Sequence, residues 1–113
     1  MAKKKFVALF MGSPSLQHPP PPDEATVAKG MAAWHKWMVD HAGVVTDTGG
    51  PRGKTKKAGP KGVSDMRNAV AGYVIVEAET HEAAAKMFEG HPHFAIFPGD
   101  SVEIMEVLPI PGS

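Results

Sequence analysis

Two histidines flank a proline near the end of the chain, in the run Gly90-His91-Pro92-His93-Phe94. Imidazole takes up and releases protons near neutral pH, so His91 or His93 could serve as a general acid or base. Glu103 follows in an otherwise apolar run, and desolvation favours the protonated form of a carboxyl group in such surroundings. Together these side chains are candidates for moving a proton on a small carbonyl or lactone substrate.

Other roles for the two histidines stay open. His91 and His93 could cap the turn between a helix and a strand through hydrogen bonds to the backbone. They could also bind a metal with a carboxylate, but two ligands in a loop at this spacing are a weak signal and name no third or fourth ligand. We therefore expect no metal and no cofactor. Glu103 and Glu106 point to opposite faces of a strand, so at least one of them is a solvated or interface residue.

These side chains must be positioned by strands and helices that the hydrophobic pattern predicts. Residues 5–11 and 70–78 are apolar on both alternating sets, which is typical of strands covered on both faces. Shorter strands are expected at 44–47 and 102–108. Gly49-Gly50-Pro51 predicts a turn after the first of these two.

Two helices complete the predicted elements. The first spans Glu24 to His41, and the second spans His81 to Glu89 between a capping Thr80 and a terminating Gly90. The first helix carries one apolar stripe, which consists of Val27, Met31, Trp34 and Met38. Trp37 widens this stripe on one side. Trp34 and Trp37 could stack on a planar ligand, but such a stripe is also typical of plain core.

The order of elements is strand, helix, strand, strand, helix, strand. It predicts an α+β fold of the ferredoxin-like βαββαβ type, a four-stranded antiparallel sheet with two helices on one face and the first and last strands paired in the middle. The other face would be apolar and uncovered, so we expect a homodimer that packs sheet against sheet. The alternative is a monomer whose Pro-rich loop folds over the sheet.

Composition limits the class of protein. With 113 residues, 42% of them hydrophobic, the chain fits a single domain over 1–113. Twelve basic and twelve acidic residues give a formal net charge of zero, so no global field favours nucleic acid. The lack of cysteine excludes disulfides and suits a cytoplasmic location. No apolar run approaches the ~20 residues that span a bilayer, so no membrane partner is expected.

Two segments contain few apolar side chains that could be buried in a core. Residues 12–22 contain four consecutive prolines and predict an extended, Pro-rich loop. Residues 52–62 contain five basic residues among three glycines, without the interleaved aromatic residues of a nucleic-acid arm. We therefore predict a flexible, solvated hairpin tip at 52–62 and no nucleic-acid partner.

Several motifs in register carry a family resemblance. They are Phe6-Val7-Ala8-Leu9-Phe10-Met11, Gly49-Gly50-Pro51-Arg52-Gly53, Gly72-Tyr73-Val74-Ile75-Val76, Gly90-His91-Pro92-His93, Val102-Glu103-Ile104-Met105-Glu106 and Pro109-Ile110-Pro111-Gly112. Together they resemble the YCII-related family of small bacterial proteins over nearly the whole chain. The resemblance implies the fold of the dimeric α/β barrels, whose members include muconolactone isomerases, a dehydrochlorinase-type enzyme and small monooxygenases.

The chain departs from that family at two places. Some members carry a His early in the first helix, paired with a downstream Asp as a proposed catalytic dyad, but the equivalent position here is Ala32. A sister branch bears an Asp-Gly-Pro-Phe motif before the third strand, where this chain has Gly62-Val63-Ser64-Asp65. The dyad mechanism therefore does not carry over, and Asp65 is a loose positional match.

The resemblance implies a pocket between the sheet and the first helix. The residues expected to serve it are His91, His93, Glu103 and Asp65 as catalytic groups, and Trp34, Trp37 and Tyr73 as ligand-binding groups. One class of function is a small-molecule enzyme or binder with isomerase, lyase or cofactor-free oxygenase chemistry. The other is a non-catalytic dimeric accessory or regulatory module. A cavity in which a His faces a carboxylate would favour the first class, and histidines and carboxylates that are exposed or already satisfied would favour the second.

Overall fold

The computed structural model describes residues 3–12 and 23–111. Its main sheet has four antiparallel strands in the order β2-β5-β1-β6. These strands are β1 (Lys4–Met11), β2 (Val45–Pro51), β5 (Val70–Ala78) and β6 (Ser101–Glu106). The predicted Pro-rich loop, beyond Gly12, lies outside the described residues.

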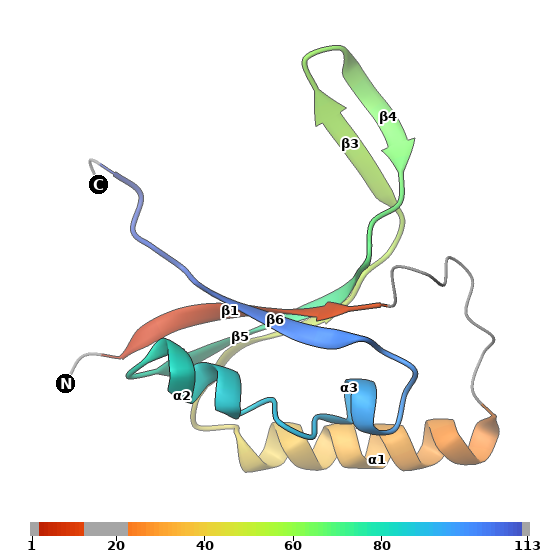
Figure 1. Ribbon diagram of the computed structural model, residues 1–113, viewed down its shortest axis with the longest axis vertical. Helices are drawn as coiled ribbons and strands as arrows, with labels where there is room; N and C mark the ends of the chain where they lie inside the picture. The colour runs from red at the N-terminus through yellow and green to blue at the C-terminus, as the bar shows by residue number, and fades with distance from the viewer. Residues whose placement is uncertain (1–2, 13–22, 112–113) are drawn as a thin grey trace.

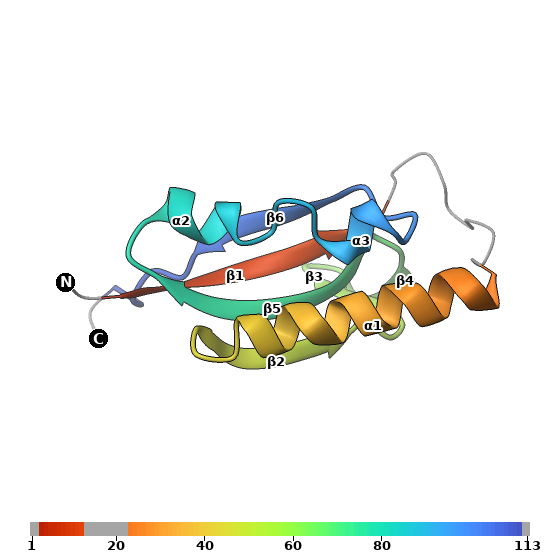
Figure 2. The same cartoon turned by 90° about the horizontal axis from the view of Figure 1, so that it is seen from below.

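Three helices cover one face of this sheet (Figures 1 and 2). They are α1 (Glu24–Asp40), α2 (His81–Lys86) and α3 (Pro92–Ala95). Asp23 and Thr80 cap the first two, because each side chain accepts a hydrogen bond from a backbone N–H three residues later, at 2.7 and 3.0 Å. In the described part of the chain, no helix is both long enough and apolar enough to pass through a bilayer.

The arrangement confirms the predicted α+β, ferredoxin-like fold with its helices on one face. Two details differ. The central pair of strands is β1 and β5, whereas β6 pairs with β1 from the edge of the sheet. The turn after α2 also contains α3, a helix of one turn that the sequence pattern did not predict.

Alternation along the strands separates the two faces of the sheet. Phe6 and Phe10 in β1 point toward the helices and are almost fully buried. The side chains on the helix side form one core cluster, which consists of Phe6, Ala8, Phe10, Trp37, Val74, Val76, Ala78, Ala84 and Phe88. The opposite surface, which we name the helix-free face, has at its centre Val7, Leu9, Tyr73, Ile75 and Met105, which pair with one another across the strands.

The predicted turn at Gly49-Gly50-Pro51 is wrong, because these residues belong to β2. This edge strand is irregular, and Gly50 pairs with Tyr73 of β5. Gly49 has a φ of 59°, and a Cβ atom there would collide with the carbonyl oxygen of Tyr73. Glycine is therefore required where the strand bulges toward its neighbour.

A second sheet of two strands leaves the main sheet after β2. It consists of β3 (Thr55–Gly59) and β4 (Gly62–Met66) and projects away from the helices (Figure 1). The predicted hairpin tip at 52–62 corresponds to β3 and the turn after it, and the hairpin continues to Met66. Apart from Thr55, every residue in both strands is exposed, so this hairpin contributes nothing to the core.

The apolar stripe of α1 serves the core only in its second half. Trp37 is buried and Met38 is partly buried, whereas Val27 is 39% exposed and Met31 is 56% exposed. Figure 2 shows the reason, because the N-terminal end of α1 extends past the edge of the sheet. Gly30, midway along the helix, is buried against the ring of Phe97.

Candidate functional site

A cavity of about 270 Å³ lies between the sheet and α1, the position that the family resemblance implies. Side chains of the sheet, of α1 and of the segment between α2 and β6 line it. Its lining includes the apolar residues Phe10, Met31, Trp34, Met38, Val74 and Phe97 and the polar residues Thr48 and His93. None of the described residues that line it is Asp, Glu, Lys or Arg. The cavity is therefore a mostly apolar space with two polar groups, as small-molecule sites generally are.

His93 enters this cavity from α3, where Pro92 occupies the first helical turn and needs no hydrogen-bond partner for its nitrogen. The ring Nε2–H of His93 donates to the carbonyl oxygen of Met11 at 2.7 Å. A carbonyl oxygen only accepts, so the neutral ring carries its hydrogen on Nε2 and keeps a lone pair on Nδ1. Among the described residues, no group donates a hydrogen bond to that Nδ1 atom.

The segment after α3 holds the imidazole of His93 in place. The backbone N–H of Gly99 donates to the carbonyl oxygen of His93 at 2.9 Å, and the N–H of Asp100 donates to that of Met11, also at 2.9 Å. A Cβ atom on Gly99 would collide with the imidazole ring, so glycine allows the segment to cross closely over it. His93 is consequently 7% exposed and fixed in orientation.

His91 has a different role, because its ring is completely buried. Its Nδ1 atom accepts a hydrogen bond from the backbone N–H of His93 at 3.0 Å and so caps α3. Its Nε2 atom has no partner among the described residues and lies among aromatic rings, with ring centroids at 5.1 Å from Phe10 and 4.6 Å from Trp34. Burial, with smaller effects of His93 and His41, lowers the pKa of His91 from 6.5 to about 4. His91 is therefore a neutral, structural residue at pH 7.

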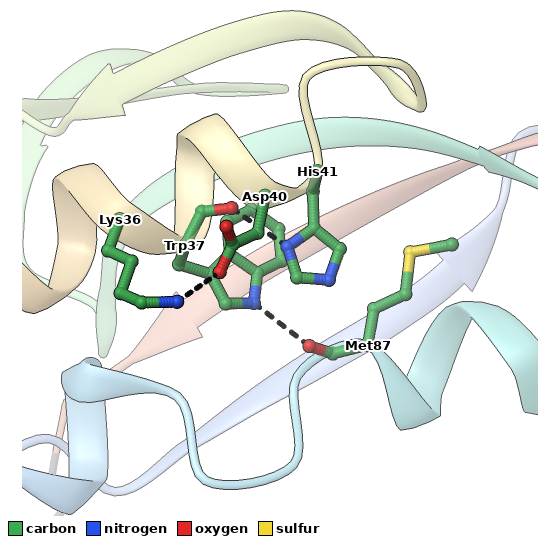
Figure 3. A network of polar contacts seen from close by, with 5 residues as sticks. All are labelled: Lys36, Trp37, Asp40, His41 and Met87. Carbon is green, nitrogen blue, oxygen red and sulfur yellow. Dashed lines mark hydrogen bonds and ion pairs between the residues drawn. The ribbon is translucent and has the colours of Figure 1, made fainter.

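Trp37 is also structural, as Figure 3 shows. Its indole Nε1–H donates to the carbonyl oxygen of Met87 at 2.9 Å, which ties α1 to the end of α2. The His41 ring stacks on the indole at 4.2 Å between centroids and donates from Nδ1 to the Trp37 carbonyl oxygen at 2.8 Å. Lys36 and Asp40 form an exposed ion pair beside it. Trp37 does not line the cavity, whereas Trp34 does and contacts Phe10 with ring centroids at 4.8 Å.

The structure separates the predicted carboxylates from the histidines. Glu103 pairs with Leu9 on the helix-free face, across the sheet from His91 and His93, and Glu106 pairs with Phe6 on the helix side. The expectation that the two glutamates point to opposite faces is confirmed, but Glu103 does not line the cavity that contains His93, so the criterion of a His that faces a carboxylate is not met there. Asp65 lies on β4 and forms an exposed ion pair with Lys56 at 2.6 Å.

Tyr73 borders the cavity at β5, but its side chain belongs to the helix-free face and is 41% exposed. Ala32, at the position of the dyad histidine in the family, is exposed on α1. Within 3–12 and 23–111, no group of three His, Asp or Glu side chains is arranged to hold a metal ion.

Sequence reasoning missed several residues that line the cavity, among them Phe10, Met31, Met38, Thr48 and Phe97. Phe97 is the clearest example, because it belongs to the irregular segment after α3, which no hydrophobic periodicity describes. One signal was present. Gly30 stands inside a strongly helical pattern, where glycine is unfavourable and usually marks a close approach of another group. In the structure that group is the ring of Phe97.

Comparisons with known proteins establish the fold. No protein-family model matches the chain, and no curated protein matches it. Among solved structures, it is similar to the 5-chloro-2-hydroxyhydroquinone dehydrochlorinase (TftG) from Burkholderia phenoliruptrix AC1100, in complex with 2,5-dihydroxybenzoquinone. The match has a TM-score of 0.53 and 16% sequence identity, and it covers 89% of this chain and 90% of the other. The chain therefore has the α+β, ferredoxin-like fold of that dehydrochlorinase.

Proposed function

We propose that this protein is a small-molecule enzyme of the YCII-related type that performs isomerase-like or lyase-like proton transfer, with His93 as the general base. One observation carries the proposal. His93 lines an apolar cavity while its Nε2–H is held by Met11, so Nδ1 is the ring nitrogen that keeps its lone pair. A base with a fixed tautomer and orientation inside a small apolar space is the arrangement that general base catalysis needs.

The proposed step begins with a C–H bond next to a carbonyl group. Nδ1 of His93 takes the proton, and the electron pair of that bond moves toward the carbonyl oxygen to give an enolate. The resulting imidazolium is stabilised by the bond from Nε2–H to the Met11 carbonyl oxygen, because a charged donor makes a stronger hydrogen bond. Return of the proton to a different carbon completes an isomerisation, and departure of a leaving group with its electron pair completes an elimination.

This mechanism uses one histidine rather than a His and Asp dyad. Asp65 pairs with Lys56 on the projecting hairpin, and Glu103 lies across the sheet. The burial that lowers the pKa of His91 to about 4 removes this second histidine as a proton carrier at neutral pH. His93 therefore acts without a carboxylate from the described residues of the same subunit.

Deuterium exchange tests the proposal. The probe is α-angelica lactone, whose ring C–H next to the carbonyl is acidic, incubated with protein in D₂O and followed by proton NMR. We expect the wild-type protein to accelerate the exchange and His93→Gln to lose about a hundredfold or more of that acceleration, as for other general bases. Equal acceleration by the variant would contradict the role of His93. Absence of acceleration in the wild type would favour the non-catalytic dimeric module instead.

We also propose that the protein forms a homodimer through the helix-free face. This face carries Tyr73 and Met105, which are 41% and 42% exposed, beside the partly buried Leu9. A net charge of zero does not oppose self-association. The occupant is a second copy, because two such faces bury each other by a single two-fold contact.

Sedimentation equilibrium tests the dimer with two matched variants. Leu9→Lys places a charge on the helix-free face and is expected to shift the protein toward monomer. Val39→Lys places the same charge on α1, at a side chain that is already 60% exposed, and is expected to leave the assembly unchanged. A monomeric wild type, or a Leu9→Lys variant that assembles as the wild type does, would contradict the proposal.

A further inference from the structure

The walls of the cavity favour a planar ligand. Phe10 and Trp34 meet with ring centroids at 4.8 Å, and Trp34 and Phe97 at 6.2 Å, so aromatic rings from a strand, a helix and a loop converge on one space. An aromatic ligand gains both apolar burial and favourable ring contacts in such surroundings.

The uncharged lining disfavours ligands that are already ionised when they enter the cavity. No Lys, Arg, Asp or Glu among the described residues lines the cavity. A carboxylate or an ammonium group would lose its hydration there without gaining an opposite charge, which is strongly unfavourable. A phenolic hydroxyl is polar but neutral at pH 7, since its proton dissociates only near pH 10.

The polar atoms that line the cavity favour a ligand that donates a hydrogen bond. His93 lines the cavity, and because its Nε2–H is already bonded to Met11, Nδ1 is the ring nitrogen left to accept a hydrogen bond. A ligand that only accepts hydrogen bonds cannot satisfy this atom. A hydroxyl group donates to Nδ1, and the Thr48 hydroxyl can donate to or accept from a second oxygen of the ligand.

Volume limits the size of the ligand. An apolar cavity of about 150 Å³ accommodates benzene. The present cavity, at about 270 Å³, therefore suits one substituted aromatic ring or two fused rings.

We infer that the cavity binds neutral phenols of one or two rings, with the ring against Trp34 and Phe97 and the hydroxyl donating to Nδ1 of His93. This inference rests on the proposed function, because it uses the same cavity and the same nitrogen. A phenol has no C–H bond next to a carbonyl group, so it occupies the cavity as a ligand and not as a substrate of the proposed step.

Three probes of nearly equal shape test it by calorimetry with the full chain at pH 6. They are 4-nitrophenol, which donates a hydrogen bond, 4-nitroanisole, which has a methoxy group instead, and 4-nitrobenzoate, which is ionised. We expect 4-nitrophenol to bind about tenfold tighter than 4-nitroanisole, which corresponds to one hydrogen bond. The benzoate should bind more weakly than either. In His93→Ala, which has no side-chain hydrogen-bond acceptor, the preference for phenol over anisole should disappear.

The outcomes separate the two proposals. Equal binding of phenol and anisole by the wild type, or a phenol preference that survives in His93→Ala, would overturn the phenol inference and leave the cavity as a ligand site. Tightest binding by the benzoate would overturn it as well. If none of the three probes binds, the phenol inference is wrong, and the lactone exchange decides the proposed function separately.

Discussion

The imidazole of His93 donates from Nε2 to the carbonyl oxygen of Met11, a residue that stands 82 positions earlier in the chain, over 2.7 Å. The bond joins the end of β1 to α3 and fixes which ring nitrogen carries the hydrogen. The same contact therefore has a structural consequence and a chemical one. Substitutions at His93 can separate the hydrogen bond to Met11 from the basic nitrogen of the ring.

His93→Gln and His93→Ala should differ in stability, but both should lose the activity. The Gln amide can still donate to the Met11 carbonyl oxygen, so we expect it to retain the free energy of unfolding within about 1 kcal/mol. Ala removes the donor and leaves space beside buried groups, which should cost about 2 to 4 kcal/mol. Both variants lack the Nδ1 base and should lose the lactone exchange. Urea unfolding measures the stabilities, and a His93→Gln variant as unstable as His93→Ala would contradict the structural half of this account.

His91 should make stability depend on pH. Burial holds its pKa in the folded protein at about 4, below the 6.5 of an exposed histidine, so between these values the unfolded chain binds more protons than the folded one. This contribution is complete above pH 6.5 and is lost as the pH falls toward 4, by roughly 3 kcal/mol in total. We expect the wild type to lose that amount between pH 7.5 and 4 relative to a variant without the titrating ring.

His91→Asn is the matched control for this pH effect. Asn is a favoured helix cap and can accept the same hydrogen bond from the His93 backbone N–H, but it does not titrate. Urea unfolding of both proteins at several pH values gives the comparison. If the free energies of unfolding of the wild type and His91→Asn change in parallel from pH 7.5 to 4, the prediction that His91 stays neutral in the folded protein is wrong.

Gly30 and Phe97 should be coupled. Alanine normally stabilises a helix interior by about 1 kcal/mol relative to glycine. Here the Cβ atom would collide with the ring of Phe97, so Gly30→Ala alone should destabilise the protein and weaken 4-nitrophenol binding. In a Phe97→Leu background, which removes the ring, the same change should become neutral or stabilising. Equal effects of Gly30→Ala in both backgrounds, measured by thermal unfolding, would disprove the contact.

Substitution of Trp37 should affect mainly stability, and substitution of Trp34 should affect ligand binding. Trp37→Phe removes the indole donor to the Met87 carbonyl oxygen and should cost about 1 to 3 kcal/mol of unfolding free energy. Because Trp37 does not line the cavity, its variant should bind 4-nitrophenol as the wild type does. Trp34→Phe should weaken binding, because Trp34 lines the cavity. A Trp37→Phe variant that keeps its stability but loses the ligand would reverse the assigned roles.

The fold could be predicted because apolar residues at both alternating sets of positions leave a clear hydrophobic pattern in β1 and β5. The hydrogen-bonding caps Asp23 and Thr80 likewise mark helix starts in the sequence itself. The strand β2 was misjudged after Asp47, since its glycines form a bulged edge strand rather than a turn. That outcome depends on pairing with β5, which local sequence does not encode.

The site was predicted in part. Periodicity indicated that Glu103 and Glu106 face opposite ways, but not which of them shares a face with the histidines. His93 and Trp34, which the sequence named as candidates, line the cavity between sheet and helix, whereas Phe97 reaches the same space only through the packing of an irregular segment on Gly30. Residues brought together by such tertiary contacts carry no periodic signal.

Nitrogen NMR of the histidine rings tests the central claim most directly. With ¹⁵N-labelled histidine, His93 in the free protein should show a protonated Nε2 and an unprotonated Nδ1. Saturation with 4-nitrophenol should shift the Nδ1 resonance in the direction of a hydrogen-bonded or protonated nitrogen, while the His91 resonances stay in place. A His93 that carries its hydrogen on Nδ1, or an Nδ1 resonance that does not move when the ligand is bound, would contradict the account.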